Sequence, residues 1–276
     1  MTVHSKTAHT DPAASPAVLR DTVDGIALLS LNRPKARNTL SEAMLAGLRD
    51  NFADIAADQR VRAVVIYANG PVFSAGHDLK EITQRRRDPD GGRAYVKDLM
   101  QRCSLLMQSI LKLPQPVIAA VEGVATAAGC QLVASCDLAI ASTAARFATP
   151  GVQIGLFCST PMVALSRNVS RKHAMEMLLT GDQVPAEDAL RMGLVNRVVA
   201  AGTAGAEALK FARKISAKSA LTVKIGKDAF YRQVEMNLAD AYRCAVEVMV
   251  ENMMARDAKE GIGAFIEKRD PKWEDR

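Results

Sequence analysis

The chain has 276 residues, of which 49% are hydrophobic and 24% are charged, and its formal net charge is +6. These values are ordinary for soluble proteins, and the length allows one large α/β unit or a domain with an appendage. No uncharged apolar run reaches the roughly 18 residues that a membrane-spanning helix needs, which excludes that class. The positive charge favours anionic partners. A phosphorylated small molecule explains it as well as nucleic acid does, and we expect no nucleic acid because no recognition motif is present.

The N-terminus and the cysteines indicate where the protein resides. Residues 1–16 have neither the apolar core of a secretion signal nor the Arg-rich amphipathic pattern of a transit peptide, so we expect a disordered tail and a cytoplasmic protein. The five cysteines lie in apolar segments, without a Cys-x-x-Cys pair or a histidine at zinc spacing. We therefore expect reduced core cysteines and no bound metal.

The N-terminal elements follow clear local signals. Alternating apolar residues at 18–20 and 25–31, divided by Asp24-Gly25, predict a β-hairpin. Ser41 is a plausible N-cap for a helix, with Glu42 in its first turn. The apolar face of that helix consists of Met44, Leu45, Leu48, Phe52 and Ile55. Residues 63–68 predict a buried strand, and a turn of small residues at 74–77 follows it.

The middle of the chain alternates loops and helices. Residues 84–93 (QRRRDPDGGR) are polar and rich in helix breakers, which predicts a mobile loop whose arginines are either solvated or attract a phosphate group. Residues 95–113 predict a long amphipathic helix, and further helices are expected at 161–169 and 171–179. A short helix should run from Pro185 to near Gly193.

The composition changes near residue 200, because mixed α/β patterns precede it and almost purely helical patterns follow. We therefore divide the chain into a tail (1–16), an α/β core (17–200) and a C-terminal helical region (201–276).

Residues 116–142 are the most informative stretch. They predict a strand at 117–121, a helix at 124–135 and a strand at 138–141. At the junction 126–129 (TAAG) only small side chains surround the N–H groups of the first helical turn, which lack partners inside the helix. Such a turn indicates either close helix packing or a place for an anion or developing oxyanion.

A second small-residue turn, at 74–77, also follows a strand and leads into a helix. Backbone N–H groups from two separate segments that converge on one carbonyl oxygen form an oxyanion hole. Sequence spacing alone does not show that these two turns meet.

Three separated motifs carry a family resemblance. They are GPVFSAGHDLKE (70–81), the stretch 116–142, and LLTGDQVPAEDALRMGLVNRVV (178–199). Together they resemble the enoyl-CoA hydratase/isomerase, or crotonase, family over about residues 18–269. Within it, AAGCQLVASCDLA and FATPGVQIGLFCSTP are similar to the subgroup called enoyl-CoA hydratase domain-containing protein 3.

The resemblance implies a fold and a substrate. The fold is an α/β crotonase-like spiral of β-β-α units with a helical C-terminal trimerisation region, assembled as a homotrimer or hexamer. The substrate is an acyl-CoA thioester of fatty acid metabolism, with coenzyme A entering as part of the substrate and no separate cofactor. Hydratase (lyase) or isomerase activity is implied.

Site residues are carried over by position. The backbone N–H groups of His77 and Ala128 match the oxyanion donors. Five further residues match positions near the CoA moiety, the last two reaching a neighbouring subunit: Ala36, Ala75, Lys80, Phe265 and Lys268.

The chain departs from the family at the two catalytic glutamates, where it has Gln131 and Gly151. An amide is no carboxylate base at neutral pH and glycine has no side chain, so efficient acid/base hydration loses both agents. Three interpretations stay open: a weak enoyl-CoA hydratase, another CoA-thioester enzyme (isomerase, decarboxylase or hydrolase), and a non-catalytic acyl-CoA-binding protein.

Other groups could substitute for the glutamates. His77 is titratable, although a solvated or capping role is the simpler expectation. Cys158 and its neighbours Ser159 and Thr160 lack an identifiable base. Asp137 is expected to cap or to form a salt bridge, and Glu122 to face a strand end.

Overall fold

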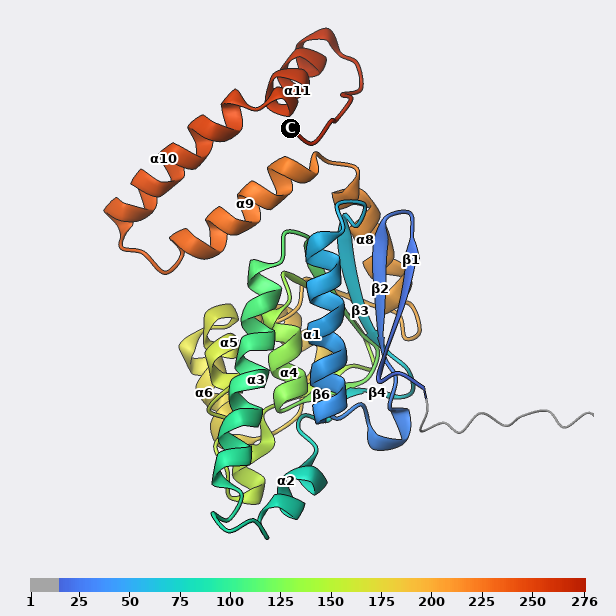
Figure 1. The fold of residues 1–276 in the computed structure, drawn as a ribbon, viewed down its shortest axis with the longest axis vertical. Helices are drawn as coiled ribbons and strands as arrows, with labels where there is room; N and C mark the ends of the chain where they lie inside the picture. The colour runs from blue at the N-terminus through green and yellow to red at the C-terminus, as the bar shows by residue number, and fades with distance from the viewer. Residues whose placement is uncertain (1–14) are drawn as a thin grey trace, which may run out of the picture.

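The computed structural model describes residues 15–276; the first fourteen residues, most of the predicted tail, lie outside the described part. Two sheets form the body of the molecule (Figure 1). The larger sheet has the order β1-β2-β3-β5-β7-β10, with β1 and β2 antiparallel and the other neighbours parallel. Its strands are Val18–Val23, Ile26–Leu31, Ala63–Ala68, Val117–Val121, Leu138–Ser142 and Arg197–Val199.

The smaller sheet has the order β4-β6-β8-β9. Its strands are Val72–Ser74, Val124–Thr126, Arg146–Ala148 and Val184–Pro185. Each of the pairs β3/β4, β5/β6 and β7/β8 therefore sends its first strand to one sheet and its second to the other, and a helical segment follows before the next pair. This repeat confirms the predicted spiral of β-β-α units.

Helices cover both faces of the larger sheet. The main core lies between its strands and α1 (Glu42–Ala57), α3 (Arg93–Lys112) and α4 (Ala128–Ser135). On the other face, α8 (Ala204–Ser216) packs its alanines 204, 208 and 212 against a second apolar cluster. Burying these apolar side chains supplies the main stabilisation of the body.

The remaining helices of the body are short, and those predicted at 161–169, 171–179 and 185–193 lie close to the predicted positions. Short helices η1 (Pro34–Ala36) and α2 (Leu79–Arg85) flank the 74–77 turn, and η2 (Pro150–Ile154) follows β8. α5 (Pro161–Asn168), α6 (Arg171–Thr180) and α7 (Ala186–Met192) form the next part of the body. In residues 15–276, no helix combines the length and the apolar character that crossing a membrane requires.

Several local predictions are confirmed. Asp24 and Gly25 both have left-handed φ values, 53° and 72°, which suits the two-residue turn between β1 and β2. Ser41 caps α1 by accepting a hydrogen bond from the Met44 N–H at 3.3 Å. The five apolar residues predicted for that helix are its buried face.

One local prediction is wrong. Residues 124–135 do not form a single helix, because 124–126 is strand β6 and α4 begins only at Ala128. The three strand residues pair with β4 on one side and β8 on the other. These tertiary hydrogen bonds override the helical spacing of the apolar residues.

The C-terminal helices α9 (Ala220–Gln233), α10 (Leu238–Met254) and α11 (Arg256–Glu267) form an arm that stands away from the body (Figure 1). No residue of α9 or α10 is fully buried. α9 is instead anchored by a polar cluster around Lys227. Its Nζ donates to Asp137 Oδ2 at 2.6 Å and to the carbonyls of Ile110 and Gln115. The Tyr231 hydroxyl donates to the other carboxylate oxygen, Asp137 Oδ1. The expectation of a salt bridge or cap at Asp137 is thus confirmed.

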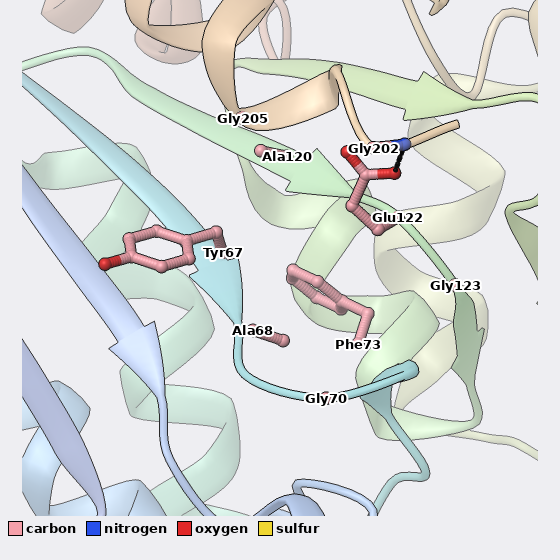
Figure 2. A pocket seen from close by; sticks show the side chains of 9 residues that line it. All are labelled: Tyr67, Ala68, Gly70, Phe73, Ala120, Glu122, Gly123, Gly202 and Gly205. Carbon is pink, nitrogen blue, oxygen red and sulfur yellow. Dashed lines mark hydrogen bonds between the residues drawn. The ribbon is translucent and has the colours of Figure 1, made fainter. Parts of the chain in front are cut away.

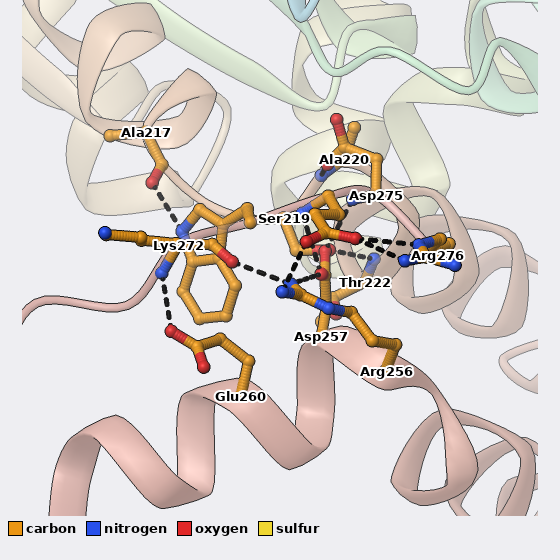
Figure 3. Close-up of polar contacts among 12 residues, drawn as sticks. Ala217, Ser219, Ala220, Thr222, Arg256, Asp257, Glu260, Lys272, Asp275 and Arg276 are labelled. Atoms are coloured by element: carbon orange, nitrogen blue, oxygen red, sulfur yellow. Dashed lines mark hydrogen bonds and ion pairs between the residues drawn. The ribbon is translucent and has the colours of Figure 1, made fainter. Parts of the chain in front are cut away.

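The C-terminal tail folds back and joins the arm to the body (Figure 3). Asp257 on α11, only 1% exposed, accepts the N–H groups of Glu274 and Asp275. The carboxylate of Asp275 in turn accepts the Ala220 N–H and pairs with Arg62, which lies just before β3. The division at residue 200 stays a prediction, although α8 packs on the sheet with the body.

Replacing Lys227 should weaken the attachment of the arm. In Lys227→Met the nearly buried Asp137 carboxylate, 14% exposed, loses its cation, and breaking such a pair lowers the free energy of unfolding by about 3–5 kcal/mol. Chemical denaturation measures the loss. Lys224→Met, at an exposed position of the same helix, should change stability by less than about 0.5 kcal/mol. Equal effects of the two substitutions would contradict the anchoring role.

Candidate active site

The two small-residue turns meet in the structure. β4 and β6 pair in parallel, with Val72 opposite Val124 and Ser74 opposite Ala125, so the segments that follow them leave the sheet side by side. A methyl group placed on Gly76 would lie 3.2 Å from the Ala128 nitrogen and 2.9 Å from the Ala127 Cβ. Only a glycine at 76 permits this approach, and its φ of +85° also favours glycine.

Both predicted donors are available. Within residues 15–276, neither the His77 N–H nor the Ala128 N–H has a backbone hydrogen-bond acceptor. Ala128 is the first residue of α4, where the helix dipole adds partial positive charge. Two unpaired N–H groups from adjoining turns have the composition of a two-donor oxyanion hole.

The residue directly before the second donor is strained. Ala127 has φ 52° and ψ −121°, a region that non-glycine residues rarely adopt. Its N–H donates to the Ala148 carbonyl at 2.9 Å, and its own carbonyl accepts the Gln131 N–H at 3.0 Å. These two bonds hold the peptide in place, and strain of this kind gathers at functional sites.

Three of the five predicted CoA-contacting residues lie beside the first turn. The Ala75 N–H donates to the Arg37 carbonyl at 3.0 Å, so the exposed Ala36 lies next to this turn. Lys80 is exposed in the first turn of α2. Phe265 and Lys268 lie on α11 and at its end, in the arm, and Phe265 is 85% exposed. Their predicted contact with a neighbouring subunit stays a prediction.

Gln131 and Gly151, the residues at the positions predicted for the family glutamates, are both buried. Gln131 is 5% exposed, and its Oε1 is buried without a partner among the described residues. At Gly151, a Cβ would lie 2.9 Å from both Cys158 Sγ and the Leu156 carbonyl oxygen. The Gly151 N–H donates to that thiol at 3.3 Å, so the 156–158 segment occupies the space that a side chain at 151 needs.

Three other carboxylates of the body serve the scaffold. Glu122 accepts the N–H groups of Gly202 and Ala204 at 2.8 and 2.6 Å, which caps the start of α8 beside a small cavity of about 140 Å³ (Figure 2). Asp78 caps α2 by accepting the Lys80 and Glu81 N–H groups. Asp137 is paired with Lys227. Their observed partners therefore assign all three carboxylates to the scaffold.

His77 is neither solvated nor a cap, so the simpler expectation for it is wrong. Its Nδ1 lies 3.4 Å from the Leu40 carbonyl, and its Nε2 is buried without a partner in the described part of the chain. Burial lowers the pKa of His77 from its ordinary value of 6.5, and the hydrogen bond to Leu40 only partly opposes this. The ring is therefore neutral at pH 7.

Sequence reasoning missed three residues of the site. Asn38, fully buried with φ 49°, donates to the Asn69 and Val72 carbonyls and so fixes the loop beside the first turn. The Thr126 and Thr149 hydroxyls are buried and lack partners within residues 15–276. A single asparagine in a loop is only a weak sequence signal for the role of Asn38. No sequence signal distinguishes the two threonines from core residues.

Comparisons with known proteins match this chain over most of its length. The family model described as enoyl-CoA hydratase/isomerase matches residues 21–276. The mitochondrial enoyl-CoA hydratase domain-containing protein 3 of Mus musculus is 49% identical over 250 residues, covering 91% of this chain and 82% of the relative. The crystal structure of the human protein of that name matches with TM-score 0.89 and 48% identity over 93% of this chain and 100% of the other. An enoyl-CoA hydratase structure from Mycobacterium smegmatis matches with TM-score 0.89 and 53% identity, covering 94% and 99%.

The comparisons correct one prediction. We expected a cytoplasmic protein, but the relatives from mouse, rat and human are all named mitochondrial. The expectation rested on the composition of residues 1–16, which is a weak indicator of compartment.

Replacing Ala127 tests the strained turn. Ala127→Gly should raise the free energy of unfolding by about 1 kcal/mol, because glycine adopts φ 52° without the clash of a Cβ, whereas Ala127→Val should lower it. Thermal or urea unfolding measures both. The control is Ala144→Gly, at an exposed site without positive φ, which should lower the free energy of unfolding. If glycine lowers it at both positions, the backbone of Ala127 is not strained.

The lowered pKa of His77 predicts how stability depends on pH. Because the folded chain disfavours the protonated ring, the unfolded chain takes up the proton first as the pH falls. The neutral ring contributes fully to the free energy of unfolding above pH 6.5. This contribution is lost as the pH falls from there through the lower pKa of the folded chain. His77→Asn should flatten the stability profile in this window, measured by urea unfolding between pH 5 and 8. His173→Asn is the control, and equal flattening by the two substitutions would refute the assignment.

Proposed function

We propose that this chain, which belongs to the enoyl-CoA hydratase/isomerase family, binds acyl-CoA thioesters and holds the thioester oxygen with the N–H groups of His77 and Ala128. Coenzyme A enters as part of the substrate, and the proposal includes no separate cofactor. The exposed Lys80 and Ala36 beside the first turn are the positions proposed for contact with the CoA moiety.

One observation carries the proposal. The turns at 74–77 and 126–129 come from different β-β-α units, yet they pack so closely that only a glycine fits at 76. The strained Ala127 directly before the second donor supports a role beyond packing, since packing alone does not require a non-glycine residue with φ 52°. Two such donors stabilise an oxyanion, and the loss of one donor typically raises the barrier by about 2.7–4 kcal/mol.

Enoyl-CoA hydration by this site is expected to be weak. The reaction needs a group that takes a proton from water and another that delivers one to carbon. Gln131 can position a water through its amide but cannot deprotonate it, and Gly151 offers no side chain. Restoring a glutamate at 151 is blocked by Cys158 and Leu156, so only Gln131→Glu is a sterically simple way to return a carboxylate.

We also propose assembly into a homotrimer or hexamer through the arm. The arm exposes large apolar side chains on α10 and α11, a surface that a monomer rarely leaves in water. They include Leu238 (74% exposed), Tyr242 (68%), Met249 (61%), Met254 (79%), Phe265 (85%) and Ile266 (73%). On assembly, Phe265 and Lys268 would reach the CoA site of a neighbouring subunit.

Calorimetric titration tests the two donors. Acetyl-CoA should bind about tenfold more tightly than CoA, because only the thioester oxygen accepts the two N–H groups, each worth about 0.5–1.5 kcal/mol. Gly76→Ala should abolish this preference by displacing the turn from Ala128. Gly91→Ala is the matched control, since Gly91 also has positive φ (67°) but has no atom near its Cβ position. Equal affinity of the native chain for CoA and acetyl-CoA would overturn the oxyanion assignment.

A further inference from the structure

The imidazole of His77 is a titratable group to which the proposed function gives no role. The backbone N–H of this residue is one of the two donors, and its side chain extends from the same turn. The ring nitrogen Nε2 is buried and has no hydrogen-bond partner within residues 15–276. A buried polar atom without a partner costs about 1–3 kcal/mol, so its position calls for a reason other than packing.

Leu40 fixes the orientation of the peptide that precedes His77. The Leu40 N–H donates to the Gly76 carbonyl at 2.7 Å, and Leu40 and His77 form an isolated parallel bridge. In a trans peptide the carbonyl and the N–H that follows it point in opposite directions. The N–H of His77 therefore points away from Leu40, which agrees with its lack of a backbone acceptor in the described part of the chain.

The same residue fixes the tautomer of the ring. His77 Nδ1 lies 3.4 Å from the Leu40 carbonyl oxygen. A carbonyl oxygen only accepts hydrogen bonds, so the neutral ring carries its proton on Nδ1 and its lone pair on Nε2. The two nitrogens lie on opposite edges of the ring. The lone pair of Nε2 therefore points away from Leu40, as the donor N–H does.

Nε2 is within reach of a thioester that the two donors hold. Bond lengths place Nε2 of a histidine about 4–6 Å from its own backbone nitrogen. A thioester oxygen that accepts the His77 N–H lies about 3 Å from the same nitrogen, and the α-carbon of the acyl chain is two bonds beyond that oxygen. The α-carbon of a thioester bound in this way therefore comes within contact range of Nε2.

The ring also has the protonation state of a general base. Burial lowers the pKa of His77 from 6.5, so Nε2 keeps its lone pair at pH 7. A positioned base that removes a proton from the α-carbon leaves an enolate, and an oxyanion hole stabilises that enolate. A reaction that removes a proton and returns it to the same chain needs only one such base, so it does not require carboxylates at positions 131 and 151.

We propose that Nε2 of His77 is the base that removes and returns protons on the carbon chain of a bound acyl-CoA; this rests on the proposed thioester binding at His77 and Ala128. In a 3-enoyl thioester the bond between Cα and its hydrogen breaks, and the proton passes to Nε2. The electron pair forms the Cα=C bond of an enolate whose oxygen accepts the two N–H groups. Nε2 then returns the proton to Cγ, and the double bond moves to Cα=Cβ.

The burial of Nε2 gives this transfer a signature. Because Nε2 is shielded from bulk water, the proton that it takes from Cα stays on the ring until it is returned. The hydrogen delivered to Cγ is therefore expected to come mainly from Cα of the same substrate molecule. A base in contact with water would instead deliver a proton from the solvent.

The test follows the conversion of trans-3-hexenoyl-CoA to 2-hexenoyl-CoA by the full-length protein, measured by the absorbance of the conjugated thioester. We expect a rate at least tenfold above buffer and, in D₂O, deuterium at Cγ in less than half of the product, measured by mass spectrometry. His77→Asn should lower the rate at least tenfold and leave the affinity for acetyl-CoA unchanged. Its amide can still donate to the Leu40 carbonyl, but it offers no base at the position of Nε2.

Two further variants make this test decisive. His77→Gln also lacks a base and should lose the rate to the same extent, which preserves the test if His77→Asn is less stable. His173→Asn is the matched control, because His173 also has a buried ring nitrogen without a partner among residues 15–276 but lies on α6. It should isomerise trans-3-hexenoyl-CoA at the native rate.

Three results would count against the role of His77, and a fourth would overturn the site itself. If acetyl-CoA binds more tightly than CoA but trans-3-hexenoyl-CoA isomerises no faster than in buffer, the base is refuted and thioester binding stands. A His77→Asn protein as fast as the native chain would limit the ring to its bond with Leu40. Product that carries solvent deuterium at Cγ in full would exclude a shielded base. Undetectable affinity for every acyl-CoA would overturn the thioester site.

Discussion

The parallel pairing of β4 with β6 is the contact on which the candidate active site depends. It brings together two turns that are about fifty residues apart in the chain. Neither turn is a site alone, because each supplies one N–H group, and only their approach at Gly76 makes a pair of donors. The strain at Ala127 is held by bonds to β8 and α4, so the geometry of the donors depends on the smaller sheet as a whole.

Charged residues elsewhere in the body stabilise the scaffold. Glu122 caps α8, Asp78 caps α2, and Asp137 anchors the arm through Lys227. Each of these carboxylates accepts hydrogen bonds from backbone N–H groups, and Asp137 also accepts them from the Lys227 ammonium and the Tyr231 hydroxyl. The family fold is retained, and glutamine and glycine stand at positions 131 and 151.

Local signals in the sequence predicted most elements, and they failed where partners decide the structure. The Asp24-Gly25 turn and the buried face of α1 depend on neighbours in sequence, so both were predictable. Residues 124–126 have helical spacing but become a strand because β4 and β8 offer backbone partners. Within the site, His77, Ala128 and Gln131 followed from motifs, whereas Thr149 carries no signal because a buried threonine looks like any core residue.

The sequence by itself determined the family, most of the strands and helices, and the presence of glutamine and glycine at positions 131 and 151, because residue identity and local spacing are sufficient for these. Only the tertiary structure decided that the two turns meet, that Ala127 is strained, and that Cys158 fills the space beside Gly151. It also decided which backbone groups and cation pair with the carboxylates of Asp78, Glu122 and Asp137. Such facts depend on distances between segments remote in the chain, which are set by packing and hydrogen bonding across the two sheets.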